Sequence, residues 1–173
     1  MRFLRPALRA LVTTFLLTIS LSLVSTCTNA QDRRFIFGLG IGTVASTDDG
    51  LGVGFRGRIS TPVNADLSFA ADLGVSAFFT GGREDASYVF DPQFSAIVTL
   101  PGEGTAVYFL AGIGAYLSSG GIDGEYNGPT LHFGIGGARP LNDAILFYEL
   151  DPALVIKKNS IALAFPLRVG III

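Results

Sequence analysis

Large apolar side chains alternate with small or polar ones along most of the chain, with a period of two residues. In residues 50–59, "GLGVGFRGRI", the large apolar side chains occupy one parity, whereas Arg56 and Arg58 share the other parity with glycines. Successive side chains of a β-strand point to opposite faces, so this pattern predicts strands with one apolar face and one narrow, polar face. No segment shows a convincing helical period, and the sequence therefore predicts an all-β fold.

Eight segments carry this alternation, and each keeps its large apolar residues on one parity. They span residues 34–43, 50–59, 66–79, 87–100, 105–117, 130–139, 144–156 and 160–173. Three prolines lie inside these segments, at Pro92, Pro152 and Pro166. Because proline cannot donate to a strand ladder, each of them predicts a bulge or a strand end.

The connections between the segments are of two kinds. The short turns marked by proline are 60–65, 101–104 and 140–143, the longer, acidic and glycine-rich loops are 44–50, 80–86 and 118–127, and 157–160 is a short exception on the loop side. Tight turns at one end and longer loops at the other are typical of an up-and-down transmembrane β-barrel.

Two all-β folds compete for this pattern: a soluble, lipocalin-like ligand-binding barrel with the large apolar set inside, and a transmembrane barrel with that set facing lipid. An eight-stranded barrel has an interior only just wide enough for side chains. Four to six large apolar groups per strand would overfill it, whereas the opposite face of Gly, Ala and Ser suits a narrow lumen. We therefore expect an eight-stranded antiparallel transmembrane barrel, closed so that no strand edge meets hydrocarbon.

The first thirty residues have a different composition and predict a cleavable signal peptide, which leaves residues 31–173 as the barrel domain. Three arginines precede an uncharged apolar run, and Thr28-Asn29-Ala30 supplies small residues at the cleavage site. Two alternatives stay open, a membrane-spanning anchor, although the apolar run is short for a helix, and lipoprotein processing at Cys27. Cys27 is the only cysteine, so the barrel domain has none.

The charge of the remaining chain argues against nucleic acid as a partner. Three of the 12 Lys and Arg residues and none of the 14 acidic residues lie in 1–30, which leaves 9 basic and 14 acidic side chains and a net charge of −5. Charged residues make up only 15% of the whole chain, which is low for a soluble domain.

Several charged residues of the segments fall on the narrow face and predict an ion-pair network in the lumen. Asp72 is diagonal to Arg56 if the second and third segments form a hairpin, and a two-residue turn at Lys158-Asn159 places Glu149 opposite Arg168. The predicted network consists of Arg56, Arg58, Asp72, Glu149, Asp151 and Arg168. Such a network either plugs the barrel as a satisfied core or gates a narrow polar pore.

These features resemble a known family. The alternation, together with "YFLAGIGAYL" and "LHFGIGGARPLNDAILFYELDPAL", is similar to the outer-membrane β-barrel domain family, small relatives of the transmembrane domain of outer membrane protein A. The resemblance implies a Gram-negative outer-membrane location, outer-membrane lipid as surroundings, and delivery by periplasmic chaperones to the assembly machinery. The chain departs from the family at its end, where Ile173 replaces a terminal aromatic residue, and it has no tryptophan.

No sequence pattern identifies catalytic chemistry. Residues 52–57 match G-x-G-x-x-G, but strand alternation continues through them, whereas a dinucleotide site needs a helix there. The one histidine, His132, has Ser118, Ser119 and Asp123 in the preceding loop, but the spacing does not identify a triad. We therefore expect no catalytic, cofactor-binding or metal-binding residues.

The acidic pairs of the loops are the remaining candidates for binding. Asp48-Asp49 and Glu84-Asp85 are predicted to be solvated loop tips that could meet a surface ligand or cations. The sequence therefore favours a non-enzymatic outer-membrane barrel with an envelope-structural or surface-interaction role. The alternatives are a narrow passive pore for small solutes or ions, a lipid A-modifying barrel enzyme, and the lipocalin-like binder.

Overall fold

The structure is a computed structural model that describes residues 35–79, 87–100, 102–119, 127–158 and 160–173. They belong to one compact unit, Arg34–Ile173. The predicted signal peptide and the predicted loop 80–86, with most of the loop 118–127, lie outside the described residues. Within the described part of the chain, no helix is long and apolar enough to cross a membrane.

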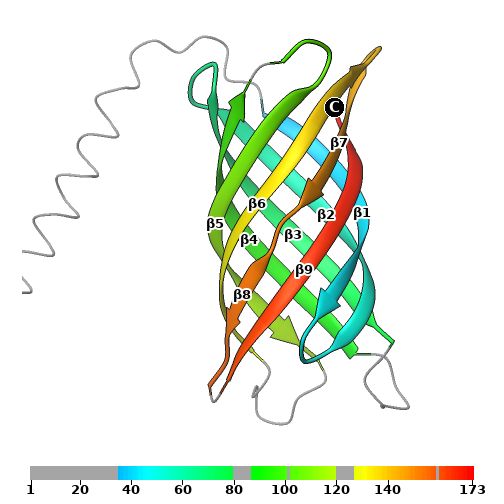
Figure 1. Ribbon diagram of the computed structural model, residues 1–173, viewed down its shortest axis with the longest axis vertical. Helices are drawn as coiled ribbons and strands as arrows, with labels where there is room; N and C mark the ends of the chain where they lie inside the picture. Colours follow the sequence, from blue (N-terminus) through cyan, green and yellow to red (C-terminus); the bar gives the residue numbers. More distant parts are fainter. Residues whose placement is uncertain (1–34, 80–86, 101, 120–126, 159) are drawn as a thin grey trace, which may run out of the picture. The chain divides into compact units, whose positions relative to one another are not determined.

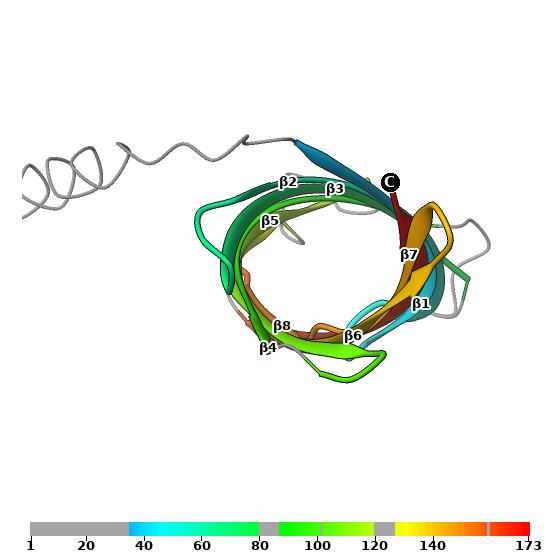
Figure 2. The same ribbon diagram turned by 90° about the horizontal axis from the view of Figure 1, so that it is seen from above.

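Nine strand segments, counted over the described residues, form one antiparallel sheet that closes on itself (Figures 1 and 2). They are β1 Ile36–Ser46, β2 Gly50–Pro62, β3 Leu67–Phe78, β4 Ser87–Leu100, β5 Ala106–Ser118, β6 Gly128–Leu141, β7 Ala144–Leu150, β8 Ala153–Ile156 and β9 Ile161–Ile172. From β1 to β7 each segment pairs with the next, β7 and β8 both pair with β6 and β9, and β1 pairs with β9 to close the barrel. The predicted closed, up-and-down topology is confirmed.

The segments β7 and β8 share one position in the barrel, so that nine segments make eight strands. Both pair with β6 on one side and β9 on the other, and the register is the same before and after the break. Pro152 lies at the break and has no backbone N–H to donate. The Asp151 N–H still donates to the Pro166 carbonyl, 3.2 Å away, which keeps the two halves aligned.

The prediction that all three prolines mark a bulge or a strand end is correct only for Pro152. Pro92 pairs with Leu73 inside β4, and Pro166 pairs with Val44 inside β9. The ladder between β4 and β5 is interrupted at Asp91 and Pro92, but its register is the same on both sides, so no residue is inserted there. The reason is that proline lacks a donor only toward one neighbour, and the strand can stay in register through its other hydrogen bonds.

The first predicted loop is shorter than its composition suggested. Residues 44–50 were expected to form a long loop, but Val44 to Ser46 extend β1 and Gly50 begins β2, which leaves only residues 47–49 as a turn. Gly50 has a φ of 81°, a conformation that glycine adopts without a side-chain penalty. At the other end, Asn142 has a φ of 32° in the two-residue turn between β6 and β7.

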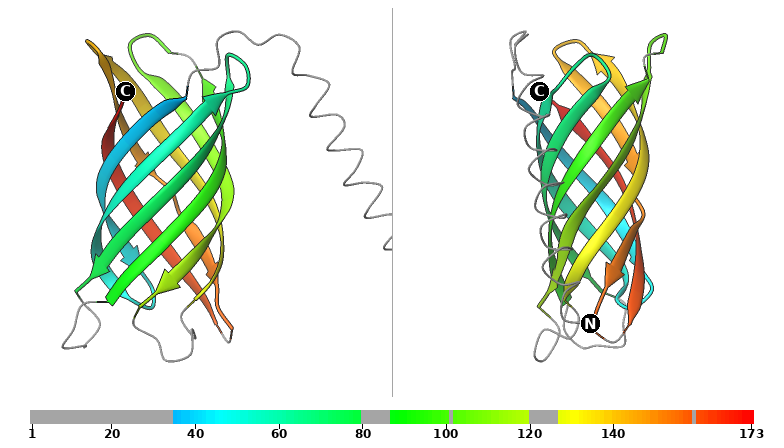
Figure 3. Two further views of the ribbon diagram at one scale, coloured as in Figure 1. Left: turned by 180° about the vertical axis from the view of Figure 1, so that it is seen from behind. Right: turned by 90° about the vertical axis from the view of Figure 1, so that its left-hand side faces the viewer.

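Both ends of the barrel wall lie at the same end as the short turns. In Figures 1 and 3, the start of β1 and the end of β9 are next to the turns that join β2 to β3 and β6 to β7. The backbone of Phe37 exchanges two hydrogen bonds with that of Ile173, of 3.2 and 2.8 Å. The turn at residues 47–49, the end of β8 and the start of β9 lie at the opposite end.

The large apolar side chains cover the outside of the barrel, as their parity predicted. On β1, for example, Phe37, Leu39 and Ile41 are each about half exposed or more, at 57, 48 and 63%. The same holds for the corresponding parity of every other strand, with Phe55, Leu73, Phe94, Ile113, Phe133, Tyr148, Leu163 and Leu167 among the exposed residues. This is the reverse of the arrangement that a lipocalin-like barrel with an apolar core requires.

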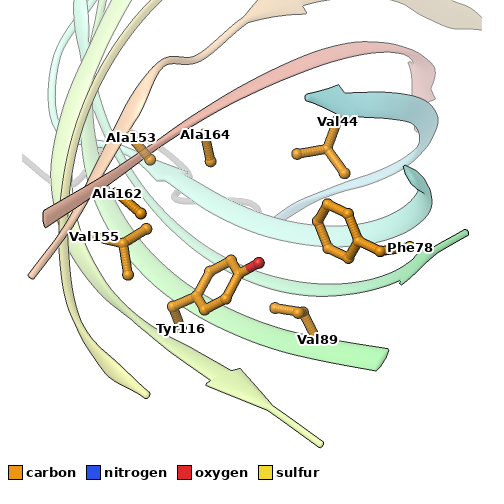
Figure 4. Packing of buried hydrophobic residues seen from close by; sticks show 8 residues of the cluster. All are labelled: Val44, Phe78, Val89, Tyr116, Ala153, Val155, Ala162 and Ala164. Atoms are coloured by element: carbon orange, nitrogen blue, oxygen red, sulfur yellow. The ribbon is translucent and has the colours of Figure 1, made fainter. Parts of the chain in front are cut away.

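The lumen is filled by two apolar clusters with polar residues between them. One cluster lies toward the long-loop end and contains Val44, Phe78, Val89, Tyr116, Ala153, Val155, Ala162 and Ala164 (Figure 4). The other lies toward the short turns and contains Ala70, Ile97, Tyr108 and Leu110. Along β4, Val89 belongs to the first cluster and Ile97 to the second, and the polar Asp91, Gln93 and Ser95 lie between them.

Candidate functional site

Arg58 is the centre of a buried ion-pair network in the middle of the lumen. Its Nε donates to Asp72 Oδ1 at 2.7 Å, and its Nη1 and Nη2 donate to Glu149 Oε2 and Oε1 at 2.8 and 3.2 Å. Asp72 lies directly opposite Arg58 on β3, whereas Glu149 comes from β7 on the far side of the barrel. All three side chains are buried.

Glu149 connects this pair to a second arginine. Arg168 Nη1 donates to Glu149 Oε1 at 2.6 Å and to Asp151 Oδ2 at 3.1 Å. The hydroxyl of Tyr108 also donates to Glu149 Oε2, at 3.0 Å. Arg58 and Arg168 share Glu149, and each has a second carboxylate, Asp72 and Asp151 respectively, so that each buried charge has partners of opposite sign, as a buried ion pair requires.

Arg56 forms the third part of the network, with partners that the sequence analysis left out. Its Nη2 is paired with Asp91 Oδ2, and its Nη1 donates to Gln93 Oε1 at 2.6 Å. Asp72 is diagonal to Arg56, as predicted, but bonds to Arg58 instead. The six predicted residues thus share the lumen, and Asp91 joins them.

A glycine between Arg56 and Asp91 makes their contact possible. Gly74 on β3 is the backbone partner of Arg56 on β2 and of Asp91 on β4, so the three residues form one row across the sheet. A Cβ at Gly74 would lie 2.8 Å from Arg56 Nη2 and 3.1 Å from Asp91 Oδ2. Because Gly74 has no side chain, the Arg56 guanidinium can lie over it and reach Asp91. The sequence did contain a signal for Asp91, because the alternation of residues 87–100 places Asp91 on the narrow face.

His132 lies in the same layer and joins a serine to the network. Its Nδ1 lies 2.9 Å from Asp151 Oδ1, and its Nε2 lies 3.4 Å from Ser95 Oγ. The order Ser, His, Asp is that of a catalytic triad. Here all three side chains are buried, and Asp151 also binds Arg168. None of the three lines the cavity of about 40 Å³ or the cavity of about 390 Å³ in the lumen. These contacts link β4, β6 and the strand break through hydrogen bonds.

The serines suggested as partners of His132 lie elsewhere. Ser118 Oγ is 3.3 Å from Ser87 Oγ, and Ser119 Oγ accepts from the Tyr88 N–H at 3.1 Å. Both contacts join β4 to the end of β5. Asp123 lies outside the described residues.

A small cavity of about 40 Å³, with a lining of polar and apolar side chains, lies between the network and the apolar cluster of the long-loop end. Asp91, Thr130 and Arg168 line it, and each has one buried polar atom, respectively Oδ1, Oγ1 and Nη2, with no hydrogen-bond partner in the described protein. A cavity needs roughly 10–15 Å³ of this kind of volume to hold one water molecule. The cavity is thus large enough for water that would satisfy these atoms.

A second cavity, of about 390 Å³, lies at the opposite end of the lumen, between the short turns and the apolar cluster that contains Leu110. Arg58 and Tyr108 lie at its inner end, and residues 102 and 104 of the turn between β4 and β5 lie at its outer end. The two cavities are therefore on opposite sides of Arg58 along the barrel, and Arg58 lines only the second.

The prediction that the acidic pair Asp48-Asp49 forms a solvated loop tip is wrong for Asp49, which is buried, whereas Asp48 is exposed. Asp49 is 6% exposed and accepts from the Tyr116 hydroxyl at 2.8 Å, and Asp48 accepts from Lys157 Nζ at 2.9 Å. These two hydrogen bonds join the turn to β5 and to the residue that follows β8. Glu84-Asp85 lie outside the described residues. Among the residues that are described, no three acidic, histidine or cysteine side chains cluster as a metal site.

No protein-family model and no curated protein matches the sequence. Several solved structures are similar to the fold of this chain. Neisserial surface protein A superposes with a TM-score of 0.71 at 15% identity, over 83% of this chain and 99% of that one. The attachment invasion locus protein Ail of Yersinia pestis gives 0.53 at 14% identity, over 83% and 100%. The fold is that of the small outer-membrane β-barrels.

The small outer-membrane barrels with this fold differ in what they do. The outer membrane enzyme PagL is also similar, with a TM-score of 0.54 and 14% identity over 77% of this chain and 97% of that one. A surface protein, an attachment protein and an enzyme thus share the barrel. Function has to be argued from the residues of this chain.

Proposed function

We propose that this protein is an integral outer-membrane β-barrel of a Gram-negative-type bacterium, exported by a cleaved signal peptide over residues 1–30. It is not an enzyme, and its role is structural in the envelope or lies in interactions of its outward loops at the cell surface. The observation that carries the proposal is the apolar outer face of a closed barrel.

That outer face suits hydrocarbon and no other solvent. Apolar side chains in water cost about 25 cal/mol per Å² of exposed area, and the exposed residues include Phe133 at 65%, Ile161 at 65% and Leu167 at 57%. The closed sheet leaves no unpaired strand edge, which is the condition for β-structure in a bilayer. Outer-membrane lipid is therefore the proposed partner of this face, and chaperones with the assembly machinery would protect it before insertion.

The orientation follows from the connections. Outer-membrane barrels place short turns in the periplasm and longer loops outside. The turns next to Asn64, Glu103 and Asn142 would then face the periplasm, and the turn at residues 47–49 would face outward. The ends of the barrel wall, at Phe37 and Ile173, would also lie on the periplasmic side.

The filled lumen supports a structural or surface role over catalysis. The buried charges of the network are paired with each other, and apolar clusters lie on both sides of it along the barrel. A charge that is already compensated inside the protein has little affinity left for a substrate. The loop end is then the part of the molecule available to a partner outside the cell.

The test begins with the membrane fraction of cells that express the full chain. A folded barrel resists SDS until it is boiled, so we expect the unboiled protein to migrate faster than the boiled protein. Orientation is tested on intact cells with a membrane-impermeant maleimide. We expect Thr47→Cys to be labelled and the matched variant Glu103→Cys to be labelled only after lysis. A protein found in the soluble periplasm without a mobility shift would overturn the proposal.

A further inference from the structure

The cavity at the short-turn end has the size and lining of a ligand site. Its volume, about 390 Å³, lies within the range of roughly 300–1,000 Å³ that small-molecule pockets occupy. Most of its lining is apolar, and the apolar side chains come from six strands, with Ile36, Ile97, Ala106, Ala138, Ile145 and Ile172. An apolar protein cavity of about 150 Å³ holds benzene, so this one has room for a ligand with an aromatic ring and a short alkyl chain.

Polar groups are few in this cavity and are mostly hydroxyls. Ser60, Ser68 and Thr99 contribute to its wall, and Tyr108 lies at its inner end. A hydroxyl both donates and accepts, so it can bond to an uncharged alcohol or carbonyl group of a ligand. A few placed polar groups in an apolar wall are what orients a ligand in a pocket.

The charges at the inner end disfavour an anionic ligand. Arg58 lines the cavity, but its Nε, Nη1 and Nη2 each bond to Asp72 or Glu149. The network as a whole has three arginines, Arg56, Arg58 and Arg168, and four carboxylates, Asp72, Asp91, Glu149 and Asp151. A carboxylate or phosphate on the ligand would compete with buried carboxylates for an arginine they already hold.

We propose that this cavity binds a small, neutral, mainly apolar molecule that carries a hydroxyl or carbonyl group. The apolar body lies against the isoleucine and alanine side chains, and the polar group bonds to the hydroxyls of the wall. This goes beyond the proposed function and requires only that the barrel folds. In the proposed orientation, the site opens toward the periplasm.

The test uses the protein purified from membranes and placed in lipid nanodiscs, with 4-phenylbutan-1-ol as the probe and 4-phenylbutanoate as its charged counterpart. Backbone amide shifts are followed by NMR during titration. We expect saturable shifts next to Ile97 and Ala106, and an affinity for the carboxylate that is weaker by about tenfold or more. Ala106→Phe fills the cavity and should weaken binding of the alcohol by a similar factor.

The matched control is Ala111→Phe, which makes the same change on the lipid face of the same strand and should leave the affinity unchanged. Ala138→Phe is a second filling variant in case Ala106→Phe does not fold, and the SDS mobility shift reports folding for each. Shifts that do not saturate, or that lie only at lipid-facing residues, would show partition into the bilayer and overturn the proposal. Equal binding of the carboxylate would overturn the neutral ligand class. Neither result bears on the membrane location, which the fractionation tests.

Discussion

Glu149 and Arg168 face each other across β7 and β9, and the distance from Arg168 Nη1 to Glu149 Oε1 is 2.6 Å. The same carboxylate also receives both Nη atoms of Arg58 from the opposite wall of the barrel. Glu149 therefore joins two parts of the sheet that are distant around the ring. A bond of this kind resists widening of the barrel, because separation of the walls would leave charges unpaired in the lumen.

Replacement of Glu149 by glutamine should destabilise the barrel strongly. Glu149→Gln leaves two buried arginines with less compensation, and loss of one partner of a buried pair costs about 3–5 kcal/mol. The measurement is urea unfolding of the protein in lipid vesicles, followed by circular dichroism. Glu103→Gln, at an exposed turn position, is the control and should leave the midpoint unchanged. Equal midpoints for both variants would contradict a stabilising role of the network.

Replacement by alanine should destabilise the barrel at Gly136 and leave its stability nearly unchanged at Gly57. A Cβ at Gly136 would overlap the ring of Tyr108, whose hydroxyl bonds to Glu149, whereas a Cβ at Gly57 would have no atom within 4 Å. Overpacking costs typically about 1–3 kcal/mol, so Gly136→Ala should lower the free energy of unfolding by that amount. Gly57→Ala should be neutral or slightly stabilising, and the same unfolding assay measures both.

An arginine on the outer face should lower the free energy of unfolding much more halfway along a strand than near a strand end. Phe133 lies midway along β6 and is 65% exposed, whereas Leu100 ends β4 next to a short turn. In a bilayer, Phe133→Arg should cost about 2–4 kcal/mol and Leu100→Arg about 0–1 kcal/mol. If both variants unfold at the same urea concentration in vesicles, this face does not contact hydrocarbon.

The filled lumen predicts that the purified protein gives no steady single-channel current in planar bilayers. Apolar side chains such as Phe78 and Leu110 lie on either side of the charged layer, and water does not readily enter so narrow an apolar passage. A steady current would favour the narrow pore. In that case, Arg56→Ala should change the current if the charge network gates it, and Arg139→Ala, at an exposed position, should not.

The sequence predicted which side chains face inward, because the pleat alternates them strictly and any slip would turn the whole apolar set inward. It also predicted the pairing of Glu149 with Arg168, because that register depends only on the length of a local turn. It did not predict that β4 and β9 continue through Pro92 and Pro166. That outcome depends on which neighbour each missing N–H would have faced, and alternation alone does not contain this information.

Local patterning thus determined the fold class, the two faces and the layer in which the charges lie. Beyond the pair of Glu149 and Arg168, only the tertiary structure decided which charges meet. Arg58 and Glu149 are 91 residues apart in sequence and meet across the lumen, and Arg56 reaches Asp91 over Gly74. Such contacts depend on closure of the sheet and on the stagger of its strands. These are properties of the whole barrel, and no single hairpin carries them.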